Sequence, residues 1–511
     1  MFRKSLRGAV LALSLSGLVL GGALGQDSTA TDVASLRQVA LGNSNDVEAW
    51  LNLGNAYLEA GDYDAAKESF LEAIAVDYRS GDAHFGLGLA EYRRGDYPAA
   101  LFEFSEVTRL YPDRFDGHFN RAVTLAKLRK FDEAADAFRQ AINEVEPEAS
   151  TQQQVDAHLG LAGQLKRLEN FSAAADAYAA ALELKPNDAE LAYQKAESLY
   201  FAGRGLEALP ELSELEARSS DHRVSSLISD IYIQQEQIDY AMRSLERALS
   251  RAEGTADLKA EGNILLKMGL LQKDLGQDGD AAASFQRAVA ANPGSWQAQY
   301  HLGVSYLEAG QAASSVGFLE QASALNPDSG EIYMALTMAY EQSGRIANVM
   351  PAAEAALELI EDPSQVAQIK FAMGRVQYYQ GDYESALASF EDVLLTEREN
   401  ALAQLWTGLA EYQLENYQSA VRYLESAVQL DPESIEARAN LGAAYFQSER
   451  FQDAELVFEL ILEDNASDAD ALYNLGLALL AQNQRDAAQE VWLQAANLGY
   501  SPAQTALREY F

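Results

Sequence analysis

Apolar residues recur along the chain at the three- and four-residue spacing of an amphipathic helix, and short polar turns interrupt this pattern at regular intervals. Segments such as those around Gly54 and Gly303 can be superimposed on one another with a lag of about 34 residues or a near multiple of it. Thirteen repeats follow, starting at residues 47, 81, 115, 155, 189, 222, 262, 296, 330, 367, 401, 435 and 469. Short insertions at 149–154, 256–261 and 364–366 interrupt the register.

Fixed columns of the repeat predict a pair of antiparallel helices. The eighth position is small in every repeat, as at Gly54, and the twentieth is alanine in most, as at Ala66. The twenty-fourth is bulky, as at Phe70. Small residues at fixed helical positions allow two helices to approach closely, and the bulky column fills the remaining space. Glycine and aspartate at Gly61 and Asp62 mark the turn between the helices.

This set of columns resembles the tetratricopeptide repeat over residues 47–502. The resemblance implies an all-α fold: a right-handed superhelical solenoid of about 13 helix-turn-helix repeats, in which the first helix of each pair lines a concave groove. It also implies protein or peptide binding as the usual role. The clamp that chaperone-binding members use for a C-terminal carboxylate is not matched. Repeats five to nine lack the aromatic seventeenth residue of the first four, so we expect this middle stretch to stack less regularly.

The chain is therefore divided into seven segments. We predict a signal peptide at 1–25, an N-terminal segment with a capping helix at 26–46, repeats 1–3 at 47–148, repeats 4–6 at 155–255, repeats 7–9 at 262–363, repeats 10–13 at 367–502 and a C-terminal capping helix at 503–511. The caps are expected because the last repeat of a solenoid otherwise exposes an apolar face.

The N-terminus has the features of a secretory signal. Arg3, Lys4 and Arg7 precede an apolar run, and small residues at 23–25 follow it, so we expect cleavage before Gln26. An uncleaved membrane anchor is the alternative, but the apolar run is short for a bilayer span of roughly 20 residues. We predict an exported protein, periplasmic or extracellular in the cell envelope, without a membrane span after cleavage.

Charge and composition narrow the partners. Asp and Glu number 77 against 38 Lys and Arg, which gives a formal net charge of −39 and argues against nucleic acid as a partner. The chain has no cysteine, so disulfides and thiol chemistry are excluded. His84, His118 and His158 follow the repeat and are interpreted as packing residues instead of metal ligands. We predict no catalytic, cofactor or metal site, because no motif for one is found.

Helical geometry places positions 2, 5, 9, 12 and 13 of each first helix on the face away from the core. We predict a partner-binding groove at the aromatic residues there: Phe85, Tyr92, Phe119, Tyr193, Tyr200, Phe201, Tyr300, Phe371, Tyr378, Tyr379, Tyr412, Phe446 and Tyr473. The alternative is that these rings stack on the next repeat. A basic row of Arg93, Lys127, Lys166 and Arg167 could receive acidic side chains or could be a solvated edge.

These observations predict a non-enzymatic scaffold that binds peptide or helical segments of envelope proteins in its groove. Two alternatives stay open: an assembly or structural component of the envelope, and an accessory subunit of an envelope polysaccharide or secretion system. The sequence leaves the oligomeric state undetermined.

Overall fold

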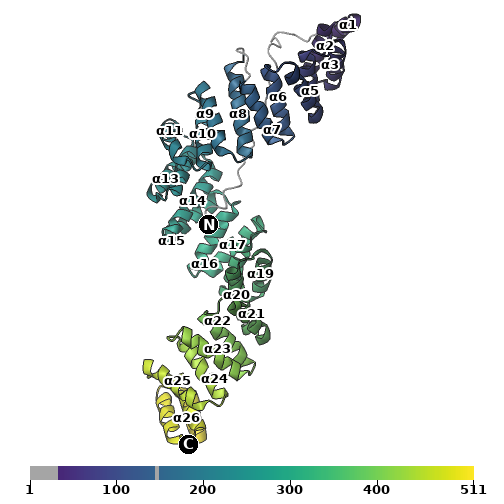
Figure 1. The fold of residues 1–511 in the computed structure, drawn as a ribbon. Coiled ribbons are helices and arrows are strands. Elements are labelled where there is room, and N and C mark those ends of the chain that lie inside the picture. The colour runs from purple at the N-terminus through teal and green to yellow at the C-terminus, as the bar shows by residue number, and fades with distance from the viewer. Residues whose placement is uncertain (1–32, 144–148) are drawn as a thin grey trace. The chain divides into compact units, whose positions relative to one another are not determined.

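The computed structural model describes residues 33–143 and 149–511, and in this part of the chain every regular element is an α-helix. The predicted signal peptide lies outside the described residues. The chain divides into two compact units, residues 1–255 (unit 1) and 256–511 (unit 2). Figure 1 shows the helices following one another as antiparallel pairs within each unit. The predicted all-α repeat fold is confirmed.

Unit 1 contains thirteen described helices. They are α1 (Val33–Gly42), α2 (Val47–Ala60), α3 (Tyr63–Val76), α4 (Gly81–Arg94), α5 (Tyr97–Leu110), α6 (Phe115–Lys127), α7 (Phe131–Asn143), α8 (Thr151–Arg167), α9 (Phe171–Leu184), α10 (Ala189–Phe201), α11 (Gly205–Arg218), α12 (His222–Gln234) and α13 (Ile238–Thr255).

Unit 2 contains fifteen helices. They are α14 (Leu258–Asp274), α15 (Asp278–Ala291), α16 (Trp296–Glu308), α17 (Ala312–Leu325), α18 (Gly330–Gln342), α19 (Ile346–Leu359), α20 (Pro363–Tyr379), α21 (Tyr383–Thr396), α22 (Ala401–Gln413), α23 (Tyr417–Leu430), α24 (Ile435–Gln447), α25 (Phe451–Asp464), α26 (Ala469–Ala481), α27 (Arg485–Asn497) and α28 (Ser501–Tyr510).

The turn inside each hairpin has one recurring backbone feature. The fifteenth residue of every repeat has a positive φ, as at Gly61 (76°) and Gly381 (83°), which lets the chain reverse direction after the first helix. Six repeats adopt the same conformation without glycine, for example at Glu169 and Glu415. A side chain in this left-handed region costs roughly 1 kcal/mol, so packing of the two helices, and not the turn residue, maintains these turns.

The core is built from the small and bulky columns that the sequence predicts. Phe70 is fully buried, and a Cβ added at Gly54 would come within 2.7 Å of its ring. A Cβ at Gly86, in the next repeat, would come within 2.4 Å of the same ring. One aromatic residue therefore joins its own first helix to that of the following repeat. Trp492 has the same role beside Gly476 and is covered by α28, with Tyr510 5.8 Å from its ring.

The three insertions in the sequence are turns of helix. They lengthen the first helices α8, α14 and α20 to 17 residues each, whereas the other first helices have 13 or 14. Every third hairpin of the array is thus extended at its N-terminal end. The sequence located these residues correctly, but a break in register does not reveal whether the extra residues form a loop or helix.

The middle repeats depart from the regular pattern at their second helices. Proline lies inside α11 at Pro210 and inside α19 at Pro351. Packing between α19 and α20 is sparser than at most repeat junctions of unit 2, and α18 contacts α20 more extensively than other successive first helices do. Residues of α18 and α20 also line a cavity, which is described below. Among the described helices, none is long and apolar enough to cross a bilayer.

Candidate functional site

Successive first helices form one continuous side of each unit, here called the first-helix face. In the part of the chain that the structure describes, a helix also contacts the next but one helix. These contacts are extensive only between first helices of successive repeats, such as α2 with α4 and α18 with α20. Second helices are held farther apart. Each stack therefore curves toward its first helices, and the first-helix face is the hollow side.

Four of the predicted groove residues are not exposed on this face. Phe85, Phe119, Tyr193 and Tyr200 are buried, with at most 9% of their surface exposed. The prediction of an open aromatic stripe is wrong for them. A large ring at such a position extends back into the hairpin. Phe119, at position 5, packs against the bulky Phe138 at position 24 of its own repeat, with ring centroids 5.5 Å apart. Helical periodicity gives the direction of a side chain, but not how far a large ring extends into the hairpin.

Aromatic residues at position 12 also have a structural partner. Tyr92, Tyr378, Tyr412 and Phe446 each lie edge-on to the aromatic residue at position 17 of the same repeat, with centroids 5.2–5.4 Å apart. These four side chains are half-buried. The predicted alternative placed these rings against the next repeat, but they pack within their own hairpin, and this packing leaves only part of each ring accessible. Tyr300 and Tyr473 are half-buried as well.

The basic row is only partly available. Arg93 and Lys127 are exposed. Lys166 is half-buried, and its Nζ lies 2.7 Å from Glu197 Oε2 on α10, so this member already has an acidic partner within the chain. The Arg167 guanidinium lies 5.3 Å from the centre of the Phe131 ring. The row as a whole is therefore a weaker candidate for an acidic partner than the sequence predicted.

Unit 2 contains a dense group of aromatic residues on α20, α21 and α22. Trp406 lies edge-on to Tyr378 at 5.3 Å and to Tyr379 at 5.7 Å. It also packs against the buried Phe390 at 5.9 Å, and Phe371 packs against the same ring at 5.7 Å. These five residues are called the aromatic cluster. Tyr379 is its most accessible member, with 68% of its surface exposed.

A charged pair borders the aromatic cluster. The Arg375 guanidinium lies 5.7 Å from the Trp406 ring centre and 6.0 Å from that of Phe371. Arg375 Nε is 3.1 Å from Glu341 Oε1 on α18, but both atoms lack a hydrogen-bond partner, because the two groups are not aligned. Burial raises the pKa of the Glu341 carboxyl, and the nearby Arg375 opposes this shift.

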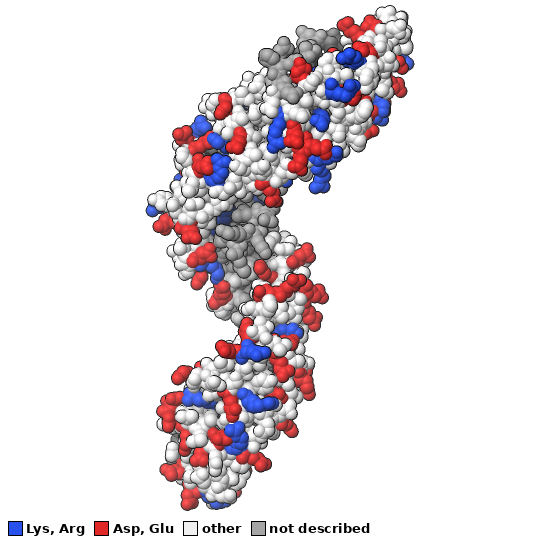
Figure 2. Space-filling view, viewed as in Figure 1, with Lys and Arg blue, Asp and Glu red and all other residues white. Residues whose placement is uncertain are grey.

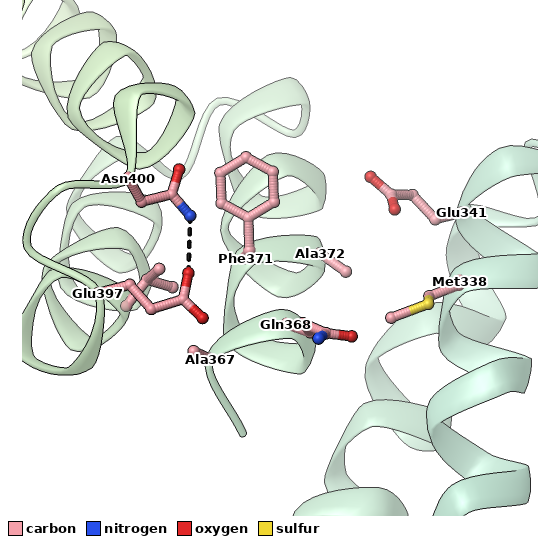
Figure 3. A pocket seen from close by; sticks show the side chains of 9 residues that line it. Met338, Glu341, Ala367, Gln368, Phe371, Ala372, Glu397 and Asn400 are labelled. Carbon is pink, nitrogen blue, oxygen red and sulfur yellow. Dashed lines mark hydrogen bonds between the residues drawn. The ribbon is translucent and has the colours of Figure 1, made fainter. Parts of the chain in front are cut away.

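A cavity of about 180 Å³ lies beside this pair. Figure 3 shows Met338 and Glu341 of α18 facing Phe371 and Gln368 of α20 across the opening. On the other side, Asn400 donates a hydrogen bond of 2.8 Å to Glu397. The cavity therefore has an apolar floor and a rim of carboxylate and amide groups, as is common for sites that hold a side chain or small ligand.

The charge of the two units differs. Unit 2 carries 37 Asp and Glu against 13 Lys and Arg, and no Lys or Arg occurs between residues 288 and 344. In Figure 2 the visible face over α19 is mostly acidic, and Lys and Arg atoms appear among the acidic ones near α21. The field around the cavity is therefore negative, which favours cationic groups.

The histidines are placed as packing residues. His84 is buried, with Nδ1 2.6 Å from Glu103 Oε2 and Nε2 3.0 Å from the Tyr78 carbonyl oxygen. His118 is buried and lies 2.6 Å from the Pro112 carbonyl oxygen. His158 is half-buried. No group of three or more histidine and carboxylate side chains is arranged to hold a metal ion in residues 33–143 and 149–511.

Sequence reasoning missed several members of the site. Met338, Glu341 and Arg375 occupy positions 9 and 12 of their repeats. The sequence prediction placed these positions on the first-helix face but considered only the aromatic residues there. Trp406 is at position 6, outside the chosen set. The available signal was the run of tyrosines at 378–379, with a tryptophan one repeat later.

Comparisons with known proteins agree with this architecture. Three family models, each described as tetratricopeptide repeat, match the chain: one at residues 51–104, 103–153, 266–329 and 371–435, a second at 411–471 and a third at 470–498. Together they cover more than half of the chain. No curated protein sequence matches it.

Solved structures match at low sequence identity. The APC/C hetero-tetramer Cut9-Hcn1 matches with 14% identity, covering 93% of this chain and 98% of that chain at a TM-score of 0.37. A chain of the Naa15/Naa10 complex bound to HypK-THB matches with 14% identity, covering 91% and 78%, at 0.40. YrrB, described as a repeat protein with an unusual peptide-binding site, matches with 18% identity, covering 37% and 95%, at 0.33.

Proposed function

Because the chain belongs to the tetratricopeptide-repeat family, whose fold is a protein–protein interaction scaffold, we propose that it is a non-enzymatic scaffold that holds a segment of another protein against the first-helix face of unit 2. The observation that carries this proposal is the aromatic cluster, in which Tyr379 keeps 68% of its surface exposed. Exposed tyrosine and tryptophan supply large contact area at a low entropic cost, which is why they dominate recognition sites.

We place the binding site in unit 2 because of the residues that surround its exposed aromatic side chain. In unit 1, Phe201 occupies the same repeat position as Tyr379 and is 44% exposed, but it packs on Phe171 of the preceding helix α9 and on Tyr200. In unit 2, Tyr379 packs on Trp406, and Phe371, another member of the aromatic cluster, lines a cavity about two helical turns away on the same helix α20. A bound segment that contacts Tyr379 and follows α20 therefore reaches a pocket as well, and side chains that fill a pocket contribute most to binding.

The proposal includes export. Arg3, Lys4 and Arg7 followed by an apolar run support a signal that directs the chain to the cell envelope, and its partners are then envelope proteins. A repeat fold without cysteine needs no disulfide to be stable there. Periplasmic and extracellular destinations are both compatible with this signal.

Crosslinking in intact cells with a reagent that does not cross the inner membrane tests both parts of the proposal. Mass spectrometry should find one or more partner proteins crosslinked to α20–α22. The variant Tyr379→Ala should reduce these crosslinks about tenfold, as for a central aromatic anchor. Phe201→Ala, which removes an exposed ring at the same repeat position in unit 1, serves as the matched control and should leave them unchanged.

Two results would contradict the proposal. Equal crosslinking of Tyr379→Ala and the parent protein would exclude the aromatic cluster as the binding surface. Crosslinks that form only with a membrane-permeant reagent would exclude export, while leaving the scaffold role intact.

A further inference from the structure

Glu341 and Arg375 leave hydrogen-bonding capacity unused at the edge of the cavity. Both Glu341 Oε1 and Arg375 Nε are buried without a hydrogen-bond partner, although they lie 3.1 Å apart. A buried polar atom without a hydrogen-bond partner costs roughly 1–3 kcal/mol. Because both atoms are shielded from solvent, a ligand gains from this only if the two side chains turn toward the cavity when it binds. The pair needs a donor for the carboxylate and an acceptor for the guanidinium. A peptide group has one of each.

The adjoining cavity is the right size for one side chain. Its volume of about 180 Å³ is comparable to that of engineered apolar cavities of about 150 Å³ that bind benzene. Met338, Phe371, Ala372 and Val393 provide apolar walls. A leucine, isoleucine, methionine or phenylalanine side chain would therefore fill it, and burying such a side chain contributes roughly 1.5–3 kcal/mol.

The charge around the cavity selects the residues on either side of that anchor. Glu341 and Glu397 line it, and Arg375 is already beside Glu341. Arg398, which follows Glu397, is exposed. On the same helix Lys370 is occupied by Asp392, with Nζ 3.1 Å from Oδ2. The helices preceding the site, α16 to α18, contain no lysine or arginine. Lysine or arginine beside the anchor would meet carboxylates, whereas aspartate or glutamate would be repelled.

We infer that the occupant of this site is an extended, cationic peptide segment with one aliphatic or phenylalanine side chain in the cavity and its main chain beside Glu341 and Arg375. This inference rests on the proposed function and specifies the partner. A helical segment is disfavoured, because its main-chain N–H and C=O groups are already paired within the helix and cannot serve the charged pair.

A displayed library of random nonapeptides, selected on the immobilised full-length protein, tests the inference. The expected enrichment is a single Leu, Ile, Met or Phe position with Lys or Arg beside it. Gln368→Phe, which adds a ring at the exposed rim of the cavity, should abolish this enrichment. Glu341→Gln keeps the shape but removes the charge, and should reduce the affinity of the selected peptide at least fivefold.

Ala388→Phe is the matched control, because it adds the same ring at an exposed position of the neighbouring helix α21. It should leave the enrichment unchanged, and thermal unfolding of all three variants verifies that they fold. An acidic consensus, a helical spacing of three and four between apolar positions, or no consensus at all would overturn the inference. If Tyr379→Ala nevertheless abolished partner crosslinks, the proposed function would survive and only the nature of the segment would be wrong.

Discussion

The first-helix faces of the two units differ in how they use their side chains. In unit 1, charged residues tie neighbouring repeats together: Arg114 to Asp82 at 2.8 Å, Lys166 to Glu197 at 2.7 Å, and Arg223 to Glu190 at 2.8 Å. In unit 2, Lys273 pairs with Glu308 and Arg375 lies beside Glu341, while aromatic and aliphatic residues pack together over α16 to α22. One scaffold thus supports a face whose polar groups bind each other and a face that leaves apolar surface open to a partner.

The largest expected effect, on the free energy of unfolding, tests whether the hydrophobic cores of the two units also differ. Phe138→Ala in unit 1 and Phe390→Ala in unit 2 each remove a fully buried ring from the same column of the repeat. Each should lower the free energy of unfolding of its own unit by about 3–5 kcal/mol. Hydrogen exchange with mass spectrometry in increasing urea measures the two units separately. Leu395→Ala, at a 77% exposed position, should change it by less than about 0.5 kcal/mol.

Equal losses in the two units would confine their difference to the first-helix face. A loss at one phenylalanine that was several kcal/mol smaller than at the other would instead show that the two cores are packed differently.

The second effect separates the units by pH. His301 in unit 2 stacks on Phe285, and burial, with a smaller contribution from Lys273, lowers its pKa to about 4. The unfolded chain protonates this histidine near pH 6.5. The buried, neutral His301 therefore stabilises unit 2 fully above that pH. As the pH falls, the free energy of unfolding of unit 2 decreases, by about 2 kcal/mol at pH 5.

His84 in unit 1 responds in the opposite direction. Burial opposes protonation, but the Glu103 carboxylate and the Tyr78 carbonyl outweigh it and raise the pKa. Its contribution is present below pH 6.5 and is lost as the pH rises through the folded-state pKa. Urea unfolding at pH 7.5 and pH 5, monitored unit by unit, should show that His301→Gln removes part of the acid sensitivity of unit 2. An unchanged pH dependence in that variant would exclude His301 as its source.

The smallest effect concerns the charged ties themselves. Lys166→Met in unit 1 leaves the half-buried Glu197 without its cation, and should destabilise that unit by about 1 kcal/mol. Lys273→Met in unit 2 removes the cation from Glu308, a 51% exposed residue on the next first helix, and should cost less than about 0.5 kcal/mol. The same urea experiment measures both. A larger loss for Lys273→Met than for Lys166→Met would reverse the contrast between the two faces.

Sequence reasoning captured the repeat well because its columns reflect direct contacts. The small residue at Gly54 and the ring of Phe70 touch, so each predicts the other. The site was harder to predict. Phe85 and Phe119 point in the expected direction, but their rings reach the hairpin interior. Glu341 has no distinguishing mark among 77 acidic residues until the arginine beside it is placed in space.

The cavity illustrates the same limit. Its lining residues come from α18, α20, α21 and the turn that follows α21. The sequence assigns these residues to helices of two successive repeats. That they surround one cavity follows only from how whole helices pack against each other.

The additional turns of α8, α14 and α20 give the array a second, longer period. Thr151, Leu258 and Pro363 each open the same kind of lengthened helix, three hairpins after the previous one. Blocks of three hairpins thus begin with a helix of the same length. A gene encoding this chain could lose or duplicate such a block by recombination and keep this spacing of long helices, so that the length of the scaffold changes in steps of three hairpins.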